Sequence, residues 1–191
     1  MEIPVVNSVR ERLRNETRSW HIAIERDLDL MSPDLTVDRY KKILIKYLGF
    51  YRPWEDLAAE VCRAVPEAVE QRRKTPKLLA DLAYFGIDGG ALRECGRLPQ
   101  IGSMAEALGG CYVVEGATLG GQIIARQVQQ KLQLGADAGS TFFHGYGAAT
   151  GRMWKAFEEL LSRYCDNGNA DATVAAAKVT FEALWLWFRE A

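Results

Sequence analysis

His21 is one of only two histidines in this chain, and it lies in a segment whose apolar residues repeat at helical spacing. An imidazole can ligate a metal ion or move a proton near neutral pH. Glu25 follows one helical turn later, where a carboxylate could orient the ring of a metal-bound histidine. Arg14 lies about two turns earlier on the same side and could contact an anionic group. The alternative is a histidine that hydrogen-bonds within the core.

A second unusual feature is a run of glycines inside a predicted helix. Residues 106–122 read EALGGCYVVEGATLGGQ and contain Gly109, Gly110, Gly116, Gly120 and Gly121. Each interior glycine costs ~1 kcal/mol relative to alanine, so something must offset the cost. At about 100° per residue, Gly109, Gly116 and Gly120 fall within about 40° of one another and form a stripe of bare backbone. Such a stripe admits a flat ligand or a crossing helix, or it marks a kink.

Together, one axial nitrogen on one helix and a glycine face on another suit a planar tetrapyrrole held edge-in between the two helices. Zinc would need more ligands than this chain supplies. The other histidine, His144, lies in a glycine-rich loop and is interpreted as exposed or structural.

Helical spacing of apolar residues runs through most of the chain and predicts the elements that must position these groups. One amphipathic helix is expected over residues 8–30, and a second over 37–61 that Pro53 kinks or splits. A short helix is expected after Thr75 as its N-cap, and a long one from the capping box at Ser103 and Glu106 to a C-cap at Gly135. Two more follow, through Met153–Tyr164 and Val174–Phe188. No convincing alternating strand pattern appears, so the prediction is an all-α, single-domain helical bundle over residues 1–191.

Composition narrows the class of protein further. The 191 residues are 48% hydrophobic with a net charge of -1, which predicts one folded core and no nucleic-acid partner. We find no apolar run near membrane-spanning length and no signal-peptide pattern at the N-terminus. The four cysteines show no metal-binding spacing, so a cytoplasmic protein with reduced thiols and no membrane association is expected.

Three groups of residues resemble the haem oxygenases, particularly the bacterial branch associated with bacteriophytochromes. Residues 13–21 read LRNETRSWH and are followed by Glu25, and residues 112–121 read YVVEGATLGG. The third group comprises Phe142-Phe143, Tyr146-Gly147, Met153-Trp154 and Phe181. The similarity extends over nearly the whole chain.

This resemblance implies an oxidoreductase for which haem is both substrate and cofactor and O2 is the co-substrate. His21 would be the proximal iron ligand. Gly116, Gly120 and Gly121 would form the catalytic distal face that steers dioxygen toward one meso carbon. The expected products are biliverdin, as the alpha isomer, carbon monoxide and ferrous iron. The residues expected to contact haem are Arg14, Thr17, Glu25, Tyr112, Val113, Leu119, Tyr146, Arg152 and Phe181.

Electrons must come from another protein, because the chain has no flavin or nicotinamide fingerprint. A ferredoxin or a flavin-dependent reductase is the implied donor, and a bacteriophytochrome apoprotein is a candidate acceptor of biliverdin. Animal members of the family carry an aspartate where this chain has Ala117, and that aspartate anchors the water that delivers a proton. Thr118 and Glu115 are the candidates here for a replacement.

Two other classes of function remain open. A haem carrier or sensor would share the fold without degrading haem. A helical interaction protein would use its glycines only to pack against another helix. The sequence favours ligand binding over pure packing, and only the family resemblance separates an enzyme from a carrier.

Overall fold

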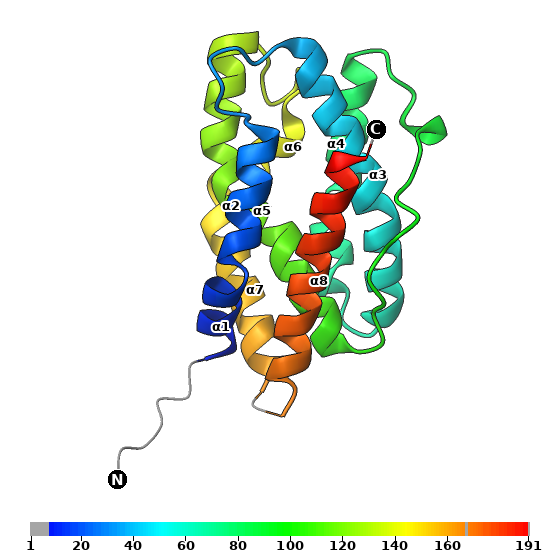
Figure 1. The fold of residues 1–191 in the computed structure, drawn as a ribbon, viewed down its shortest axis with the longest axis vertical. Coiled ribbons are helices and arrows are strands. Elements are labelled where there is room, and N and C mark those ends of the chain that lie inside the picture. The colour runs from blue at the N-terminus through cyan, green and yellow to red at the C-terminus, as the bar shows by residue number, and fades with distance from the viewer. Residues whose placement is uncertain (1–7, 167, 191) are drawn as a thin grey trace.

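The computed structural model describes residues 8–166 and 168–190, and within them the chain forms an all-α bundle (Figure 1). The predicted fold class is confirmed. Residues 1–7 of the segment in which a signal peptide was sought lie outside the described ranges. Figure 1 shows α8 beside α2, with α5 crossing the centre of the bundle. The helices are α1 (Val9–Glu16), α2 (Arg18–Leu28), α3 (Val37–Val61), α4 (Thr75–Tyr84), α5 (Met104–Leu132), α6 (Thr141–His144), α7 (Thr150–Tyr164) and α8 (Ala170–Arg189), and the 3-10 turns are η1 (Pro66–Ala68), η2 (Glu70–Arg72), η3 (Gly89–Ala91) and η4 (Gly147–Ala149).

The first predicted helix is two helices, because the chain leaves helical geometry at Thr17. Its φ and ψ are -106° and -2°, and its hydroxyl donates to the carbonyl of Leu13 at 2.7 Å. A threonine that bonds back to the preceding turn bends a helix, and the spacing of apolar residues does not show this. The helix that carries His21 therefore starts at Arg18 and ends at Leu28, and it is followed by the left-handed C-cap Asp29 with φ 45°.

The helix α3 continues through Pro53, so the expected split does not occur. Proline cannot donate to the carbonyl four residues earlier, which belongs to Gly49. That carbonyl instead accepts from the backbone N–H of Cys95 at 2.8 Å. A tertiary hydrogen bond thus replaces the missing helical one.

The start of α4 depends on a partner from elsewhere in the fold, whereas both ends of α5 are capped locally. Thr75 is the first residue of α4 rather than its cap, and the carboxylate of Glu55 accepts from the backbone N–H groups of Lys74 and Thr75 at 2.6 and 3.3 Å. Ser103 caps α5 and accepts from the N–H of Glu106, whereas the Glu106 carboxylate accepts from the N–H of Gly102 at 2.7 Å, so only the serine half of the predicted capping box is found. The C-cap is the left-handed Gln133, two residues before the predicted Gly135.

Part of the glycine run is explained by helix crossing. A Cβ on Gly109 would lie 2.1 Å from the carbonyl oxygen of Thr173 in α8, and one on Gly110 would lie 2.5 Å from a ring carbon of Trp54. A Cβ on Gly121 would lie 2.6 Å from the carbonyl oxygen of Phe143. These three glycines allow neighbouring backbone or aromatic atoms to approach the α5 backbone.

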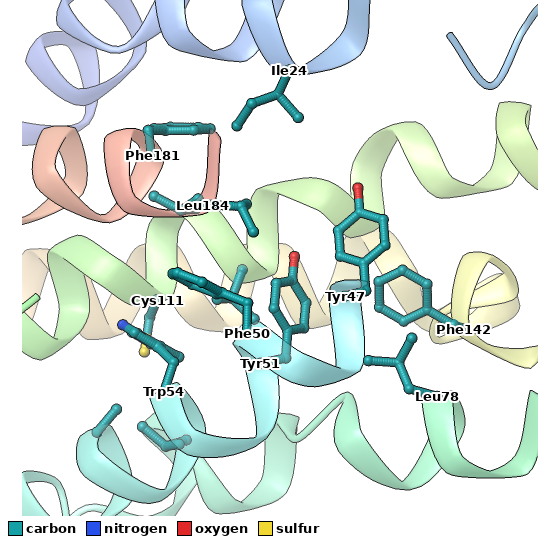
Figure 2. Close-up of a cluster of buried hydrophobic side chains, with 14 of the residues drawn as sticks. Ile24, Tyr47, Phe50, Tyr51, Trp54, Leu78, Cys111, Phe142, Phe181 and Leu184 are labelled. Atoms are coloured by element: carbon teal, nitrogen blue, oxygen red, sulfur yellow. The ribbon is translucent and has the colours of Figure 1, made fainter. Parts of the chain in front are cut away.

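The core lies between α3, α5 and α8, where aromatic side chains of α3 pack beneath α2 and α8 (Figure 2). Phe50, Tyr51 and Trp54 are almost fully buried there. None of the described helices combines the length and the apolar character that a membrane span requires.

Candidate functional site

A cleft with two lobes lies between the helix that carries His21 and the glycine segment of α5. The inner lobe has a volume of about 300 Å³ and the outer lobe about 500 Å³. Small-molecule sites in proteins span roughly 300–1,000 Å³. The lobes meet at five residues that line both, namely His21, Val113, Gly116, Gly120 and Phe181. The histidine and two of the glycines are therefore at the centre of one site.

Gly116 and Gly120 differ from the other glycines of α5 in what their missing side chains would meet. A Cβ built on either residue has no atom within 4 Å. Their bare backbone consequently faces open space in the cleft. The glycines of the predicted stripe therefore have different surroundings. Gly109 accommodates α8, whereas Gly116 and Gly120 leave room for a ligand.

His21 presents its ring to the cleft from α2. Its Nδ1 atom lies 3.3 Å from a carboxylate oxygen of Glu25, and 52% of the histidine side chain is exposed. The ring of Phe181 lies edge-on at 6.3 Å between centroids. With Nδ1 directed at a carboxylate, Nε2 is the nitrogen left to bind a metal, and the carboxylate favours this tautomer.

The outer lobe is cationic. Arg14 and Arg18 line it one helical turn apart, together with Asn15 and Thr17. Guanidinium groups are suited to binding carboxylates. Tyr112, Leu119 and Trp154 form the opposite wall, and burial raises the pKa of the Tyr112 hydroxyl. The predicted contact residues that line this lobe are Arg14, Thr17, Tyr112, Val113, Leu119 and Phe181.

The inner lobe is mostly apolar but receives two tyrosines from α3, Tyr47 and Tyr51. Both hydroxyl oxygens point toward the side of the cluster where Ile24 and Phe181 lie (Figure 2). The Tyr51 hydroxyl is buried without a hydrogen-bond partner in the described part of the chain. Burial raises the pKa of both hydroxyls, so they stay protonated at neutral pH.

Sequence reasoning missed these two tyrosines because their spacing fits the apolar stripe of a core helix. Arg18 was also missed, although its position four residues after Arg14 was a usable signal. Ala117, Ile124 and Phe143 also line the inner lobe, with further apolar residues of α2, the segment after it and α8. Nothing in their residue types distinguishes them from ordinary core residues.

Three predicted site residues do not line the cleft. Gly121 faces the backbone of Phe143. Arg152 is exposed at the start of α7, and it is absent from the lining of both lobes. Tyr146 donates its hydroxyl proton to the carboxylate of Glu115 on a different side of α5, at 2.9 and 3.0 Å.

Neither Glu115 nor Thr118 offers its side chain to the cleft. The Glu115 carboxylate is held by Arg72 and Lys74, and the Thr118 hydroxyl donates to the carbonyl of Glu115 at 2.6 Å. A replacement for the aspartate missing at position 117 must therefore come from elsewhere. The inner-lobe tyrosines are the hydroxyl groups that the structure places there.

One imidazole and bare helical backbone line the same cleft, with cations at one end, and this arrangement is suited to a flat anionic macrocycle. Comparison with known families agrees with this interpretation. The family model for heme oxygenase matches residues 7–190, which is nearly the whole chain. The chain therefore belongs to the haem oxygenase family.

Solved structures of haem oxygenases share the fold. The NO- and CO-bound heme oxygenase from Neisseria meningitidis aligns with a TM-score of 0.80 and 22% identity, covering 95% of this chain and 90% of that one. Heme oxygenase 2 from Chlamydomonas reinhardtii, solved without heme, aligns with a TM-score of 0.72 and 18% identity, covering 96% and 97%. The search of curated proteins gives no significant match.

Proposed function

We propose that this protein cleaves haem with O2 and external electrons to biliverdin, carbon monoxide and ferrous iron. The observation that carries the proposal is the position of Gly116 and Gly120, whose bare backbone faces open space across the cleft from His21. Haem, when bound, supplies both the ring that is oxidised and the iron that activates dioxygen. The bacteriophytochrome-associated branch and a cytoplasmic location remain part of the proposal.

The donor set fits haem. His21 would bind the iron through Nε2, with Glu25 orienting the ring. Arg14 and Arg18 would hold the propionates at the outer end of the cleft. The inner end carries Glu25 and Asp29 instead, which disfavours propionates there. The charge difference between the two ends would therefore fix the direction in which the macrocycle enters.

Gly116 and Gly120 would contribute to catalysis because they have no side chains. Side chains at these positions would fill the space above the ring, so glycine keeps that face accessible while α5 limits the directions open to a small molecule. A fixed macrocycle beneath a fixed helix exposes one meso carbon in preference to the others. We propose the alpha isomer as the product.

Tyr51 and Tyr47 would hold protons in the inner lobe. An unpartnered hydroxyl at the cleft wall can donate to an ordered water molecule, which supplies the connection that Ala117 cannot make. Because these hydroxyls stay protonated at neutral pH, they orient water and pass protons without becoming charged themselves.

Replacing Tyr51 with phenylalanine is expected to lower the rate of biliverdin formation by about 100-fold, the lower end of the loss that follows removal of a proton-transfer group. The free energy of unfolding should stay the same or rise, because the lost hydroxyl has no partner to leave unsatisfied. Single-turnover absorbance and urea unfolding measure the two effects. The matched control is Tyr40→Phe, since Tyr40 is equally buried but does not line the cleft. Equal turnover in both variants would remove Tyr51 from proton delivery.

The test of the function is an absorbance experiment on the purified protein with one equivalent of hemin. A histidine-type Soret band followed by a biliverdin spectrum on adding reductant in air supports the enzyme. A haem complex that survives this treatment supports a carrier or sensor. If hemin produces no Soret shift, the glycines serve packing alone.

Electron supply belongs to the same proposal. A ferredoxin or flavin-dependent reductase would deliver electrons where the cleft opens to solvent, and its own redox group would supply what this chain's residues do not. A bacteriophytochrome apoprotein would then take up the biliverdin.

A further inference from the structure

A cluster of buried charges lies on the side of α5 away from the cleft. At its centre the Glu115 carboxylate lies 2.5 Å from Nη1 of Arg72 and 2.5 Å from Nζ of Lys74. The Tyr146 hydroxyl donates to this carboxylate and accepts from Lys74 at 2.6 Å. The side chains of the two cations and of Glu115 are all less than one-tenth exposed. We call these four residues the Glu115 clamp.

The clamp joins α5 to three other segments. Arg72 ends η2 and also donates to the carbonyl of Met153 in α7 at 2.9 Å. Lys74 immediately precedes α4, and its ammonium donates to the carbonyl of Arg72 at 2.7 Å. Tyr146 belongs to the connection between α6 and η4. The position and rotation of α5 at residue 115 are therefore fixed from several directions.

The helix needs such a fixing point at this position. Glu115 immediately precedes Gly116, and three glycines lie within the next six residues. Glycine weakens the local preference for helix and offers no side chain to fix the helix against its neighbours. At about 100° per residue, the cleft-lining positions 113, 116, 117 and 120 lie roughly 100–160° away from position 115 around the helix. The clamp thus holds the side of α5 that is turned away from the cleft, while the opposite side lines the cleft.

Stability alone does not account for this arrangement. Replacing a buried ion cluster with apolar residues of similar volume is often neutral or stabilising, because taking charges out of water is costly. Charges and hydrogen bonds do, however, demand particular distances and directions, which apolar contacts do not. A clamp of this kind specifies one orientation of a helix.

We propose that Glu115 is a positioning residue that sets the rotation of the Gly116–Gly120 segment relative to His21, and thereby the meso carbon at which the macrocycle is opened. Glu115 acts through the glycines and does not touch the substrate. This inference rests on the proposed function. It also gives Tyr146, which does not line the cleft, a role as a member of the clamp.

The test uses the full-length protein with Glu115→Gln, Tyr146→Phe and the control Glu55→Gln. Glu55 is a buried carboxylate of the same region that accepts from the backbone N–H groups of Lys74 and Thr75, and its hydrogen bonds include none to the Glu115 carboxylate or the Tyr146 hydroxyl. In the haem-free protein, amide hydrogen exchange at residues 116–121 should accelerate by about tenfold or more in the two clamp variants and not in the control. Chromatography of the products from hemin, O2 and reductant should show one dominant biliverdin isomer for the unaltered protein and for Glu55→Gln, and a mixture for both clamp variants.

If Glu115→Gln does not fold, Tyr146→Phe still tests the proposal. This variant removes one hydroxyl and leaves the ion pairs of Glu115 with Arg72 and Lys74 in place. Unchanged exchange at residues 116–121, equal acceleration in the control, or an unaltered isomer ratio would each overturn the positioning role. Failure of the proposed haem cleavage would give a different result from failure of the positioning role. In that case the unaltered protein forms no biliverdin, and the exchange data show whether the clamp orders the glycine segment without setting a reaction site.

Discussion

Replacing His21 with alanine is expected to abolish the histidine-type Soret band of the hemin complex and to lower turnover by more than about 100-fold. Loss of a mere hydrogen-bond partner of a metal ligand costs about 10–100-fold, and loss of the ligand itself exceeds that. In the described part of the chain no other histidine and no cysteine lines either lobe of the cleft. The substitution therefore leaves the iron without a comparable ligand.

The fold should not be affected by this change. The His21 side chain is about half exposed, and alanine favours helix more than histidine does. We expect the free energy of unfolding to change by less than about 0.5 kcal/mol. Thermal unfolding followed by circular dichroism measures it, and hemin titration measures the binding. Glu25→Gln is the control that keeps the ligand and loses only its carboxylate partner. Full turnover in His21→Ala would show that the axial ligand lies elsewhere.

Replacing Gly120 with leucine is expected to separate stability from function. The new side chain projects into open space, so it meets no protein atom near its Cβ. Leucine in a helix interior is more favourable than glycine by about 0.8–1 kcal/mol, so the haem-free protein should become more stable. The leucine would occupy the cleft, and we expect hemin affinity to fall by about 10–100-fold and biliverdin formation to be lost. Hemin titration and urea unfolding on the same samples test both signs.

Gly109→Ala is the matched control for this substitution. Its Cβ would lie 2.1 Å from the carbonyl oxygen of Thr173, so α8 must shift to admit one methyl group. Overpacking of this kind costs about 1–3 kcal/mol. Gly109 is absent from the lining of both lobes, so hemin affinity should change little. If Gly120→Leu instead destabilises the protein and leaves turnover unchanged, Gly120 is structural as well.

The sequence by itself determined the helical class, because a period of 3.6 in the apolar residues follows from helix geometry and requires no partner. It also determined which residue types were unusual. A histidine beside an apolar helix face with a glutamate one turn later is a possible ligand, and five glycines in one helix cannot be explained by local preference. These two features, with their neighbouring motifs, carried the family resemblance.

Only the tertiary structure decided what each of these residues faces. Gly109 and Gly120 are equivalent by helical spacing, yet α8 covers one and the cleft leaves the other open. Tyr51 reads as a core residue and lines the cleft, whereas Tyr146 reads as a haem contact and binds Glu115. Helix periodicity fixes the direction of a side chain relative to its own helix. The neighbour in that direction comes from residues far away in the chain, and no local pattern encodes it.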